Sequence, residues 1–256
     1  MSVYACADLH GCRWAWDAIR NHLQPEDKLY FLGDAADRGA DGWQIMKELL
    51  ADPRVMYIKG NHEQLLLDAI GNCSPETFDP DDFHWDNAMN NWFMNGGGST
   101  YNSFLADPDR FNVIRELKNL PFIACYYNIN NENIYLVHAG CNAHDINNLN
   151  EDDAIWDRFH YRFNRWDGDD NEVIVHGHTP IPLMVQEQDE IANFFSDEEL
   201  PIRNGDMIEP GAYWYAGGHK VNIDCGCVFT DVCVLLNLDT WDEEIFYPED
   251  NNESQE

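Results

Sequence analysis

Basic residues are scarce in this sequence. Its 256 residues include 15 Lys and Arg against 47 Asp and Glu, which gives a formal net charge of −32. Phosphate backbones and anionic membranes select basic surfaces, so we expect neither nucleic acid nor a membrane as a partner. We interpret the acidic excess as a solvated surface that aids solubility, with adaptation to a salty cytoplasm as the alternative. A substrate that is itself an anion would then need a local reversal of the field, by metal ions or a few Arg.

Long apolar runs are also missing. No run approaches the roughly 18 residues needed to span a bilayer, and the first residues carry neither a basic segment nor a small-residue cleavage site. We therefore expect a cytoplasmic protein whose eight Cys are reduced thiols. Cys6, Cys125 and Cys233 lie inside apolar runs and should be buried. Cys225 and Cys227 are too closely spaced for a typical zinc pair.

Repeats and Gly/Ser-rich or Pro-rich linkers are absent, so we expect a single domain over residues 1–240. Two acidic and aromatic stretches, 72–98 and 181–220, interrupt the regular pattern and are candidates for a cap and a flap over the site. In the flap interpretation Tyr213–Tyr215 would contact the substrate. The simpler alternatives are packed peripheral helices and a β-hairpin. The stretch 241–256 is polar and acidic and should be a flexible tail.

Short apolar runs alternate with amphipathic stretches in the first 70 residues. The pattern predicts strands over 3–8, 28–33 and 55–59, and helices over 13–23, 42–50 and 62–70. This order implies a largely parallel sheet with right-handed crossovers. Later apolar runs predict strands over 122–129 and 134–137, and closing antiparallel strands over 221–224 and 228–238. Two sheets with flanking helices would accommodate this many strands.

Polar residues of metal-ligand type follow five apolar runs. The five blocks are Asp8-Leu9-His10-Gly11, Gly33-Asp34-Ala35-Ala36-Asp37-Arg38-Gly39, Gly60-Asn61-His62-Glu63, His138-Ala139-Gly140 and Gly177-His178-Thr179. Open α/β sheets place their ligands at the carboxyl ends of the strands, so we expect these blocks to converge at one edge. Each block alone is weak, but five in this order are a specific signal.

The donor types in these blocks indicate a catalytic metal centre. The six ligand-type residues are Asp8, His10, Asp34, Asn61, His138 and His178. A nitrogen and oxygen set without thiolate suits manganese, iron or zinc in a catalytic role better than a structural zinc. Six ligands shared between two ions, with one carboxylate bridging, leave room for water, and two such ions can activate water at a phosphoryl group. We expect two divalent ions, manganese first, with iron or zinc as alternatives.

The blocks resemble the signature of the phosphoprotein phosphatase family within the calcineurin-like metallophosphoesterases. That signature is Gly-Asp-x-His-Gly, Gly-Asp-x-x-Asp-Arg-Gly and Gly-Asn-His-Glu, then two later histidines; here Ala7 replaces the first Gly. The resemblance covers about residues 3–238. The compact layout is similar to the bacterial and phage branch, which includes lambda-type protein phosphatase and the diadenosine tetraphosphatases. It implies an α/β (α+β) fold, a four-layer β-sandwich of two mixed sheets flanked by helices.

The resemblance also implies which residues hold metal. Asp8, His10 and Asp34 would bind the first ion, and Asp34 would bridge to the second. Asn61, His138 and His178 would complete the second ion.

Four other residues would handle the substrate if the resemblance holds. His62 would protonate the leaving group, and Asp37 would orient His62 and favour its cationic form. Arg38 would hold the phosphate through two-point contacts. We assign Arg158 as the second phosphate-binding arginine.

Some neighbours are set aside. Arg162 and Arg165 are rivals for the second arginine. His176 shares a strand face with His178, but we expect it to pack or to support the ligands, because Pro180 stands where many metallophosphoesterases have an extra ligand. Glu63 should compensate charge at a helix start or make a supporting contact.

The leading hypothesis is a metal-dependent phosphomonoesterase that acts on phosphoserine or phosphothreonine, with phosphotyrosine as a further substrate. Its partner would be a phosphoprotein or phosphopeptide. Symmetrical hydrolysis of diadenosine tetraphosphate, or of another dinucleoside polyphosphate, is the alternative; the acidic surface disfavours it mildly. A catalytically silent metal-binding module is the remote alternative, against which the intact His62, Asp37 and Arg38 argue. The sequence leaves the oligomeric state open.

Overall fold

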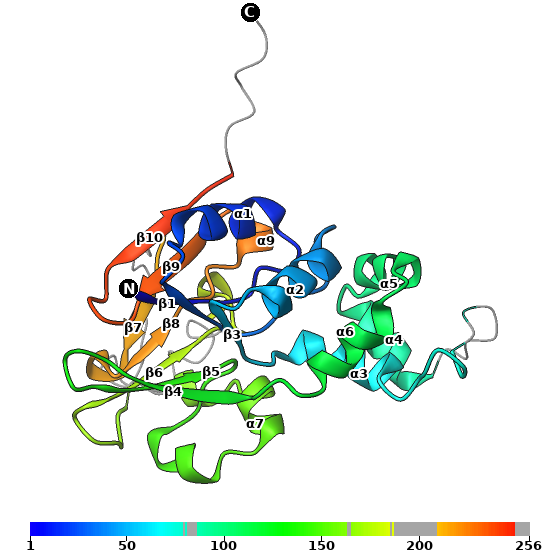
Figure 1. Ribbon diagram of the computed structural model, residues 1–256. Coiled ribbons are helices and arrows are strands. Elements are labelled where there is room, and N and C mark those ends of the chain that lie inside the picture. The colour runs from blue at the N-terminus through cyan, green and yellow to red at the C-terminus, as the bar shows by residue number, and fades with distance from the viewer. Residues whose placement is uncertain (79, 81–85, 163–164, 185, 187–208, 249–256) are drawn as a thin grey trace, which may run out of the picture.

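Two five-stranded sheets form the body of the molecule in the computed structural model (Figure 1). The structure describes residues 1–78, 80, 86–162, 165–184, 186 and 209–248. The first sheet has the order β10 (Glu243–Phe246), β9 (Cys233–Asn237), β1 (Val3–Cys6), β2 (Lys28–Phe31) and β3 (Val55–Tyr57). The second has the order β4 (Ile123–Tyr127), β5 (Asn133–Val137), β6 (Glu172–His176), β8 (Lys220–Asn222) and β7 (Tyr213–Tyr215).

Both sheets are mixed. Strands β1, β2 and β3 run parallel, while β9 and β10 are antiparallel additions. In the second sheet β5, β6 and β8 are parallel, and β4 and β7 are antiparallel edge strands. The expected fold of two mixed sheets flanked by helices is therefore confirmed.

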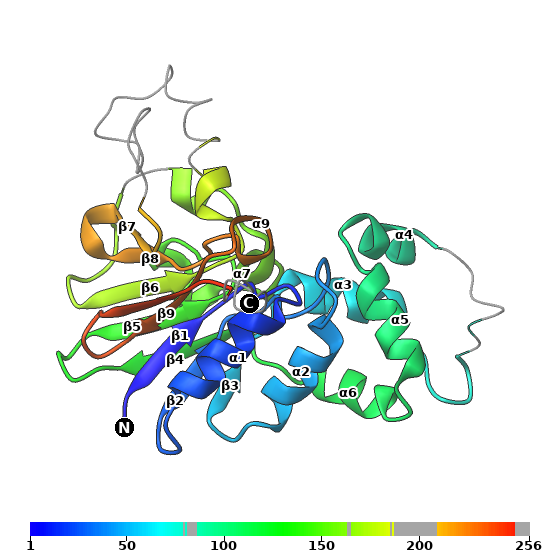
Figure 2. The same ribbon diagram turned by 90° about the horizontal axis from the view of Figure 1, so that it is seen from above.

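The helices flank the two sheets. They are α1 (Arg13–His22), α2 (Gly42–Ala51), α3 (Asn61–Ile70), α4 (Asn87–Met94), α5 (Gly98–Ala106), α6 (Arg110–Leu117), α7 (Glu151–Trp156) and the short α9 (Cys227–Thr230). Helices α1 and α2 lie beside the first sheet, α7 lies beside the second, and α4, α5 and α6 gather at one side (Figures 1 and 2). Among the described residues, no helix is long and apolar enough to cross a membrane.

The core follows from the two-residue period of the strands. Val3 and Ala5 of β1 belong to an apolar cluster that also contains residues of β5, β6 and β8, so this cluster joins the two sheets. Cys6 faces the other way and packs with buried residues of α1, α2 and α3. A third cluster joins Val137 and Ile174 of the second sheet to Ile155 of α7. The layer order is thus helix, sheet, sheet, helix.

The candidate insertions contain regular structure where they are described. Helix α4 lies within 72–98, packs on α3 and buries Trp92. In the stretch 181–220, Tyr213–Tyr215 forms β7, an edge strand paired with β8, which corresponds to the β-hairpin alternative. Residues 79, 81–85, 185 and 187–208 lie outside the described part, so the cap and flap interpretations stay predictions there.

Three local expectations differ from the structure. The predicted strand over 228–238 begins as α9, because the chain passes through Asp231 with φ of 56° before β9 starts at Cys233. The predicted strand over 221–224 corresponds to β8, which is antiparallel to β7, as expected, but parallel to β6 on its other side. Strand β10 lies inside the expected tail, where Ile245 and Phe246 supply apolar side chains; residues 249–256 lie outside the described part.

The eight Cys are all free thiols. Cys6 and Cys233 are buried as expected. Cys125 is exposed, because β4 is the edge strand of its sheet and presents this side chain outward.

Candidate active site

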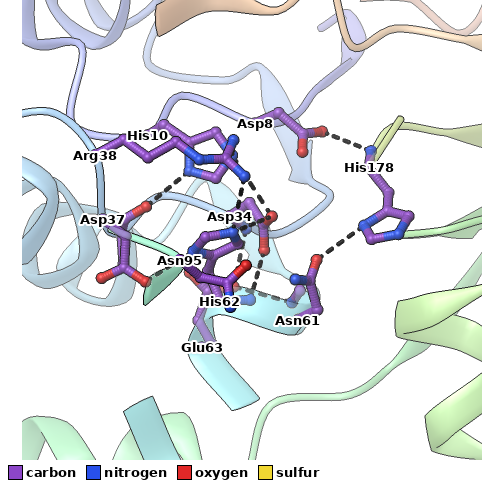
Figure 3. Close-up of polar contacts among 12 residues, drawn as sticks. Asp8, His10, Asp34, Asp37, Arg38, Asn61, His62, Glu63, Asn95 and His178 are labelled. Carbon is purple, nitrogen blue, oxygen red and sulfur yellow. Dashed lines mark hydrogen bonds and ion pairs between the residues drawn. The ribbon is translucent and has the colours of Figure 1, made fainter. Parts of the chain in front are cut away.

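The predicted site residues converge at the carboxyl ends of the strands (Figure 3). Loops after β1, β2 and β3 carry the blocks from the first sheet, and loops after β5 and β6 carry the two late histidines from the second. The donor atoms of His10, Asp34 and His62 form one close group, and those of Asp34, His138 and His178 form another, each within 4.8 Å. Asp34 is common to both groups.

The loops that hold these residues are strained. Positive φ angles occur at Asp8 (55°), His10 (44°), Asp34 (60°), Asp37 (69°), Arg38 (65°) and His178 (68°). Residues other than glycine seldom adopt this region, and such strain gathers at functional sites. The surrounding packing must therefore fix each of these backbones.

Two pairs of glycines let the loops approach each other closely. A Cβ on Gly11 would lie 2.6 Å from the carbonyl carbon of Gly39, and a Cβ on Gly33 would lie 2.5 Å from Cα of Gly60. Any larger residue at these positions would push the motif loops apart.

Asp34 faces different histidines with its two carboxylate oxygens. Oδ2 lies 3.6 Å from Nε2 of His10, and Oδ1 lies 3.5 Å from Nε2 of His138. Burial alone would raise the pKa of Asp34, but the surrounding histidines, His138 first, hold it below its usual range. An ionised carboxylate with a different nitrogen donor at each oxygen suits a ligand shared by two cations.

In two histidines, His10 and His138, the ring nitrogen that faces Asp34 is the unprotonated one. Nδ1 of His10 donates to the carbonyl of Ala36 at 2.9 Å, and Nδ1 of His138 donates to the carbonyl of Leu32 at 2.6 Å. Each Nε2 is then unprotonated, as metal coordination requires. Burial lowers the pKa of both imidazoles, which keeps them neutral.

Asn61 lies between the two late histidines. Its Oδ1 is 2.9 Å from Nε2 of His138 and 2.8 Å from Nδ1 of His178. Nε2 of His138 carries a lone pair, as Oδ1 does, so a cation between them would relieve their repulsion. Burial also lowers the pKa of His178 well below its usual range. The amide and the two rings therefore fit the second metal position.

Asp8 lies beside the first group and has an unsatisfied buried oxygen. Oδ2 accepts a hydrogen bond from the backbone N–H of His178 at 3.0 Å, whereas Oδ1 is buried without a partner. Burial, with the carboxylates of Asp224 and Asp34, raises the pKa of Asp8 well above its usual range. A buried carboxylate oxygen without a donor is costly unless a cation contacts it. The residues present thus fit the predicted pair of ions.

The ring of His62 is held by a carboxylate outside the predicted ligand set, while its backbone N–H donates to Oδ1 of Asp34 at 2.9 Å. Its Nδ1 donates to Oδ2 of Asp37 at 2.7 Å, and both side chains are buried. Burial would lower the pKa of His62, but the carboxylates of Asp34 and Asp37 outweigh it and raise the pKa. His62 is therefore biased toward the cation, as a general acid requires. Its Nε2 lies 3.9 Å from Asp34, so it faces the site.

Arg38 and Arg158 enter the site from different sides. The guanidinium of Arg38 donates to Nε2 of His10 at 2.6 Å, and its other terminal nitrogen lies 3.1 Å from Nε2 of His62. Nε of Arg158 donates to Nε2 of His178 at 3.1 Å. Arg38 and His178 lie on opposite sides of Asp34 (Figure 3). Both predicted arginines thus reach the centre.

Glu63 ties the loops together. Its carboxylate accepts hydrogen bonds from the backbone N–H groups of Asp34 at 2.8 Å, Ala35 at 3.0 Å and Gly60 at 2.9 Å, and from the hydroxyl of Tyr57 at 2.9 Å. Burial raises the pKa of Glu63 to about 7, while these donors favour its ionised form. Glu63 makes the supporting contact expected of it and fixes the end of β2 against the start of α3.

The residues set aside at first lie outside the ligand set. His176 is buried, and its Nε2 lies 2.8 Å from the hydroxyl of Tyr215. Arg162 stacks over the ring of Phe159 at 4.8 Å, and Arg165 lines a surface hollow with Asp167. Arg158 contacts the ligand histidine His178.

Three residues that contact or adjoin the site residues were not predicted from the sequence. The indole N–H of Trp92 lies 3.0 Å from each carboxylate oxygen of Asp37, and the backbone N–H of Asp37 donates to Oγ1 of Thr100 at 2.9 Å. No local pattern marks Trp92 or Thr100. Asp224 lies next to Asp8 with a buried, unpartnered Oδ2, and burial raises its pKa to about 7. Asp224 follows an apolar run, as the ligand blocks do, and that signal could have identified it.

A family comparison agrees with this geometry. Residues 1–222 match the model of the calcineurin-like phosphoesterase family. The chain belongs to this family. A dinuclear centre of divalent metals is used throughout the family, and the donor groups around Asp34 are its candidates here.

Two curated relatives of this metallophosphoesterase share one name, symmetrical bis(5'-nucleosyl)-tetraphosphatase. The relative from Pseudomonas syringae pv. tomato is 22% identical over 288 aligned residues, which cover 94% of this chain and 87% of the relative. The relative from Delftia acidovorans is 24% identical over 144 residues, which cover 55% of this chain and 44% of the relative.

Solved structures support the fold. A candidate diadenosine tetraphosphatase superposes with a TM-score of 0.56 at 16% identity, covering 96% of this chain and 92% of that protein. A metallophosphoesterase from Sphaerobacter thermophilus gives 0.53 at 15% identity, covering 97% and 88%. A mutant of a cold-active protein tyrosine phosphatase also gives 0.53 at 13% identity, covering 96% and 77%.

The relatives correct one expectation. A phosphoprotein or phosphopeptide partner was predicted, but the curated relatives are named for a nucleotide substrate. That prediction is wrong. The prediction used the net charge of −32 as an argument against a polyanionic substrate. The electric field at a site, however, depends on the charges that line that site. Here Arg38 and Arg158 enter the centre, and bound cations would add to them.

Proposed function

We propose that this metallophosphoesterase hydrolyses dinucleoside tetraphosphates symmetrically and releases two nucleoside diphosphates. The shared name of the two curated relatives supports this substrate class. Hydrolysis of a dinucleoside polyphosphate was the alternative hypothesis from the sequence. It keeps the metal-binding, acid and phosphate-binding roles assigned to the same residues.

One observation carries the proposal: Arg38 and Arg158 contact different histidines on opposite sides of Asp34. A phosphate chain that crosses the centre would meet a guanidinium on each side of the phosphorus atom under attack. Guanidinium groups match phosphate oxygens in two-point contacts. A phosphomonoester could bring both arginines to one phosphoryl group, whereas a linear polyphosphate could occupy the two separated arginines with neighbouring phosphates.

The metal positions follow from the donors. Asp8, His10 and Asp34 would hold one ion, and Asp34, Asn61, His138 and His178 the other. When bound, such a pair lowers the pKa of water and polarises phosphoryl oxygens. Manganese remains our first expectation, because the donors are nitrogen and oxygen atoms without thiolate.

The remaining steps belong to side chains. Arg38 and Arg158 would bind phosphate groups on either side of the central bridging oxygen. They would bring a phosphorus atom next to that oxygen into line for attack by water. His62 would give its Nε2 proton to the bridging oxygen that leaves with one nucleoside diphosphate. Asp37 would hold Nδ1 of His62 and stabilise the imidazolium before transfer.

The test is a product analysis. Purified protein with Mn²⁺ and diadenosine tetraphosphate should yield ADP as the sole nucleotide product, measured by ion-exchange chromatography. Equal amounts of ATP and AMP would overturn symmetrical cleavage. A rate no higher than that of Asp34→Asn would overturn the substrate class. The Arg165→Ala variant is the control for a loss of positive charge away from the site, because Arg165 lies at a separate surface hollow, and it should keep the wild-type rate.

A further inference from the structure

Two exposed aromatic side chains adjoin the candidate site and have no role in its chemistry. Phe229 of α9 is 70% exposed, and Trp156 at the end of α7 is 41% exposed. Single exposed apolar residues are common on protein surfaces. These two differ because each contacts a site residue, and because α9 and α7 lie on different sides of the strand ends (Figure 1).

Phe229 lies against the first arginine. Cζ of Arg38 is 5.5 Å from the centroid of the Phe229 ring. The same guanidinium contacts His10 and His62, so a single side chain separates Phe229 from the reacting position. The ring anchors no apolar cluster of the described residues, and its exposure leaves a face free for a ligand.

Trp156 lies against the opposite side. Its ring centroid is 6.2 Å from that of His178, and the two planes are nearly perpendicular at 86°. Arg158 follows two residues later and contacts the same histidine. On one side the aromatic ring contacts the arginine itself, and on the other the ring and the arginine both contact His178. Each side of the centre therefore presents an arginine and an exposed aromatic ring.

We propose that Phe229 and Trp156 stack the two nucleobases of the substrate, one at each end of the tetraphosphate. This inference rests on the proposed function. Every base has a π face, so aromatic stacking is strong and tolerant of base identity. The neighbouring arginines would bind the phosphates between the bases. An arginine and an exposed aromatic ring on each side of the centre also suit a substrate whose two halves are identical, and they favour cleavage at the centre.

Phe159 is a less suitable platform, although it is 68% exposed. The guanidinium of Arg162 lies 4.8 Å over its ring and covers one face. It therefore provides a comparison within the same region.

The experiment compares ADP, which carries a nucleobase, with pyrophosphate, which carries none. Phe229→Ala and Trp156→Ala are assayed for kcat/KM on diadenosine tetraphosphate, and for inhibition of that reaction by ADP and by pyrophosphate. We expect each variant to lose about 10-fold in kcat/KM and in ADP affinity, with pyrophosphate inhibition unchanged. Phe229→Tyr should retain the wild-type values. Tyr127→Ala, an exposed aromatic on the edge strand β4, is the matched control.

The outcomes separate the two proposals. If the wild-type protein does not convert diadenosine tetraphosphate into ADP, the proposed function fails. If it does, but both variants keep kcat/KM within twofold, the stacking role is overturned. Equal losses for ADP and pyrophosphate would also overturn it, because they would indicate a general distortion of the phosphate site.

Discussion

Nδ1 of His62 lies 2.7 Å from Oδ2 of Asp37, with both side chains buried beside the ligand set. His62 shares a donor group with His10 and Asp34, whereas Asp37 belongs to neither donor group. In the mechanism proposed above, this pair would handle the proton of the leaving group.

Asp37→Asn should lower the pKa of His62, because the neutral amide removes a carboxylate that stabilises the imidazolium. A general acid is active while protonated, so activity falls as pH rises through its pKa. We expect the alkaline limb of the pH–kcat profile to move about 1 unit toward lower pH, with kcat at pH 8 reduced at least about 10-fold. An unmoved limb would contradict the role of Asp37. Metal content should match that of the wild type.

Trp92→Phe should weaken the pair of His62 and Asp37 by removing a hydrogen bond to Asp37. The phenyl ring keeps most of the buried volume but removes the N–H that contacts both oxygens of Asp37. Hydrogen bonds to charged groups contribute about 1.5–3 kcal/mol, so we expect kcat to fall about 10-fold with little change in KM. Trp43→Phe is the matched control, because its indole N–H donates to Asp107, away from the site. Equal losses in the two variants would indicate a general packing defect.

His62→Ala should harm alkyl phosphates more than diadenosine tetraphosphate. An alkoxide is a strongly basic leaving group that needs a proton, whereas a phosphate monoester oxygen ionises with a pKa of about 6. We expect a loss of about 10²–10⁴-fold on methyl phosphate and a smaller loss on the tetraphosphate. The measurement is kcat on both substrates at matched Mn²⁺. A loss of equal size on both would argue against proton donation by His62.

Asp34→Asn should weaken both metal positions together. Its two oxygens face different histidines, so the substitution removes charge from both donor groups at once. Dialysed protein analysed by plasma mass spectrometry should hold less than one ion per chain. Asn61→Ala should instead lower the occupancy of one position. Retention of one ion at full occupancy in Asp34→Asn would show that this carboxylate does not bridge.

His160 should make the protein sensitive to mild acid. It is fully buried, and burial lowers its pKa to about 4 from an ordinary 6.5, despite the neighbouring Asp157. Below pH 6.5 the unfolded chain binds this proton and the folded chain does not, so stability is lost as pH falls from 6.5 toward 4. Between pH 7.5 and 5.5 the loss from this group is about 1 kcal/mol.

Urea unfolding of the wild type and His160→Gln at these two pH values tests that estimate. The variant should lose about 1 kcal/mol less between them. An identical pH dependence would show that His160 has the same pKa in the folded and unfolded states. His144→Gln is the contrasting variant: Asp167 and Asp145 raise the pKa of the exposed His144, so removing it should increase the loss of stability between pH 7.5 and 5.5.

The strand ends were predictable because they repeat one pattern, an apolar run followed by a ligand-type residue. That pattern located Asp34 and His138, and the geometry brings them within 3.5 Å. It could not locate Trp92, because an indole that supports Asp37 from another helix leaves no periodic trace. The turn at Asp231 was hidden for a different reason: a left-handed residue ends α9, and the composition around it resembles a strand.

Substrate choice was the weakest inference from sequence, again for a physical reason. Net charge is a sum over the whole surface, whereas phosphate binding depends on Arg38 and Arg158 at one point. The same argument applies to the exposed rings of Phe229 and Trp156, whose importance depends on what lies next to them.

The two sheets supply different parts of the candidate ligand set, so bound metals would have a mechanical role. Asp34 and Asn61 follow strands of the first sheet, whereas His138 and His178 follow strands of the second. An ion held by both would act as a cross-link between sheets that otherwise meet through apolar side chains. Since ligand binding stabilises the folded state, chelation should first increase amide exchange along the seam where β1 faces β6. Metal supply would then influence the lifetime of the folded chain in addition to its turnover.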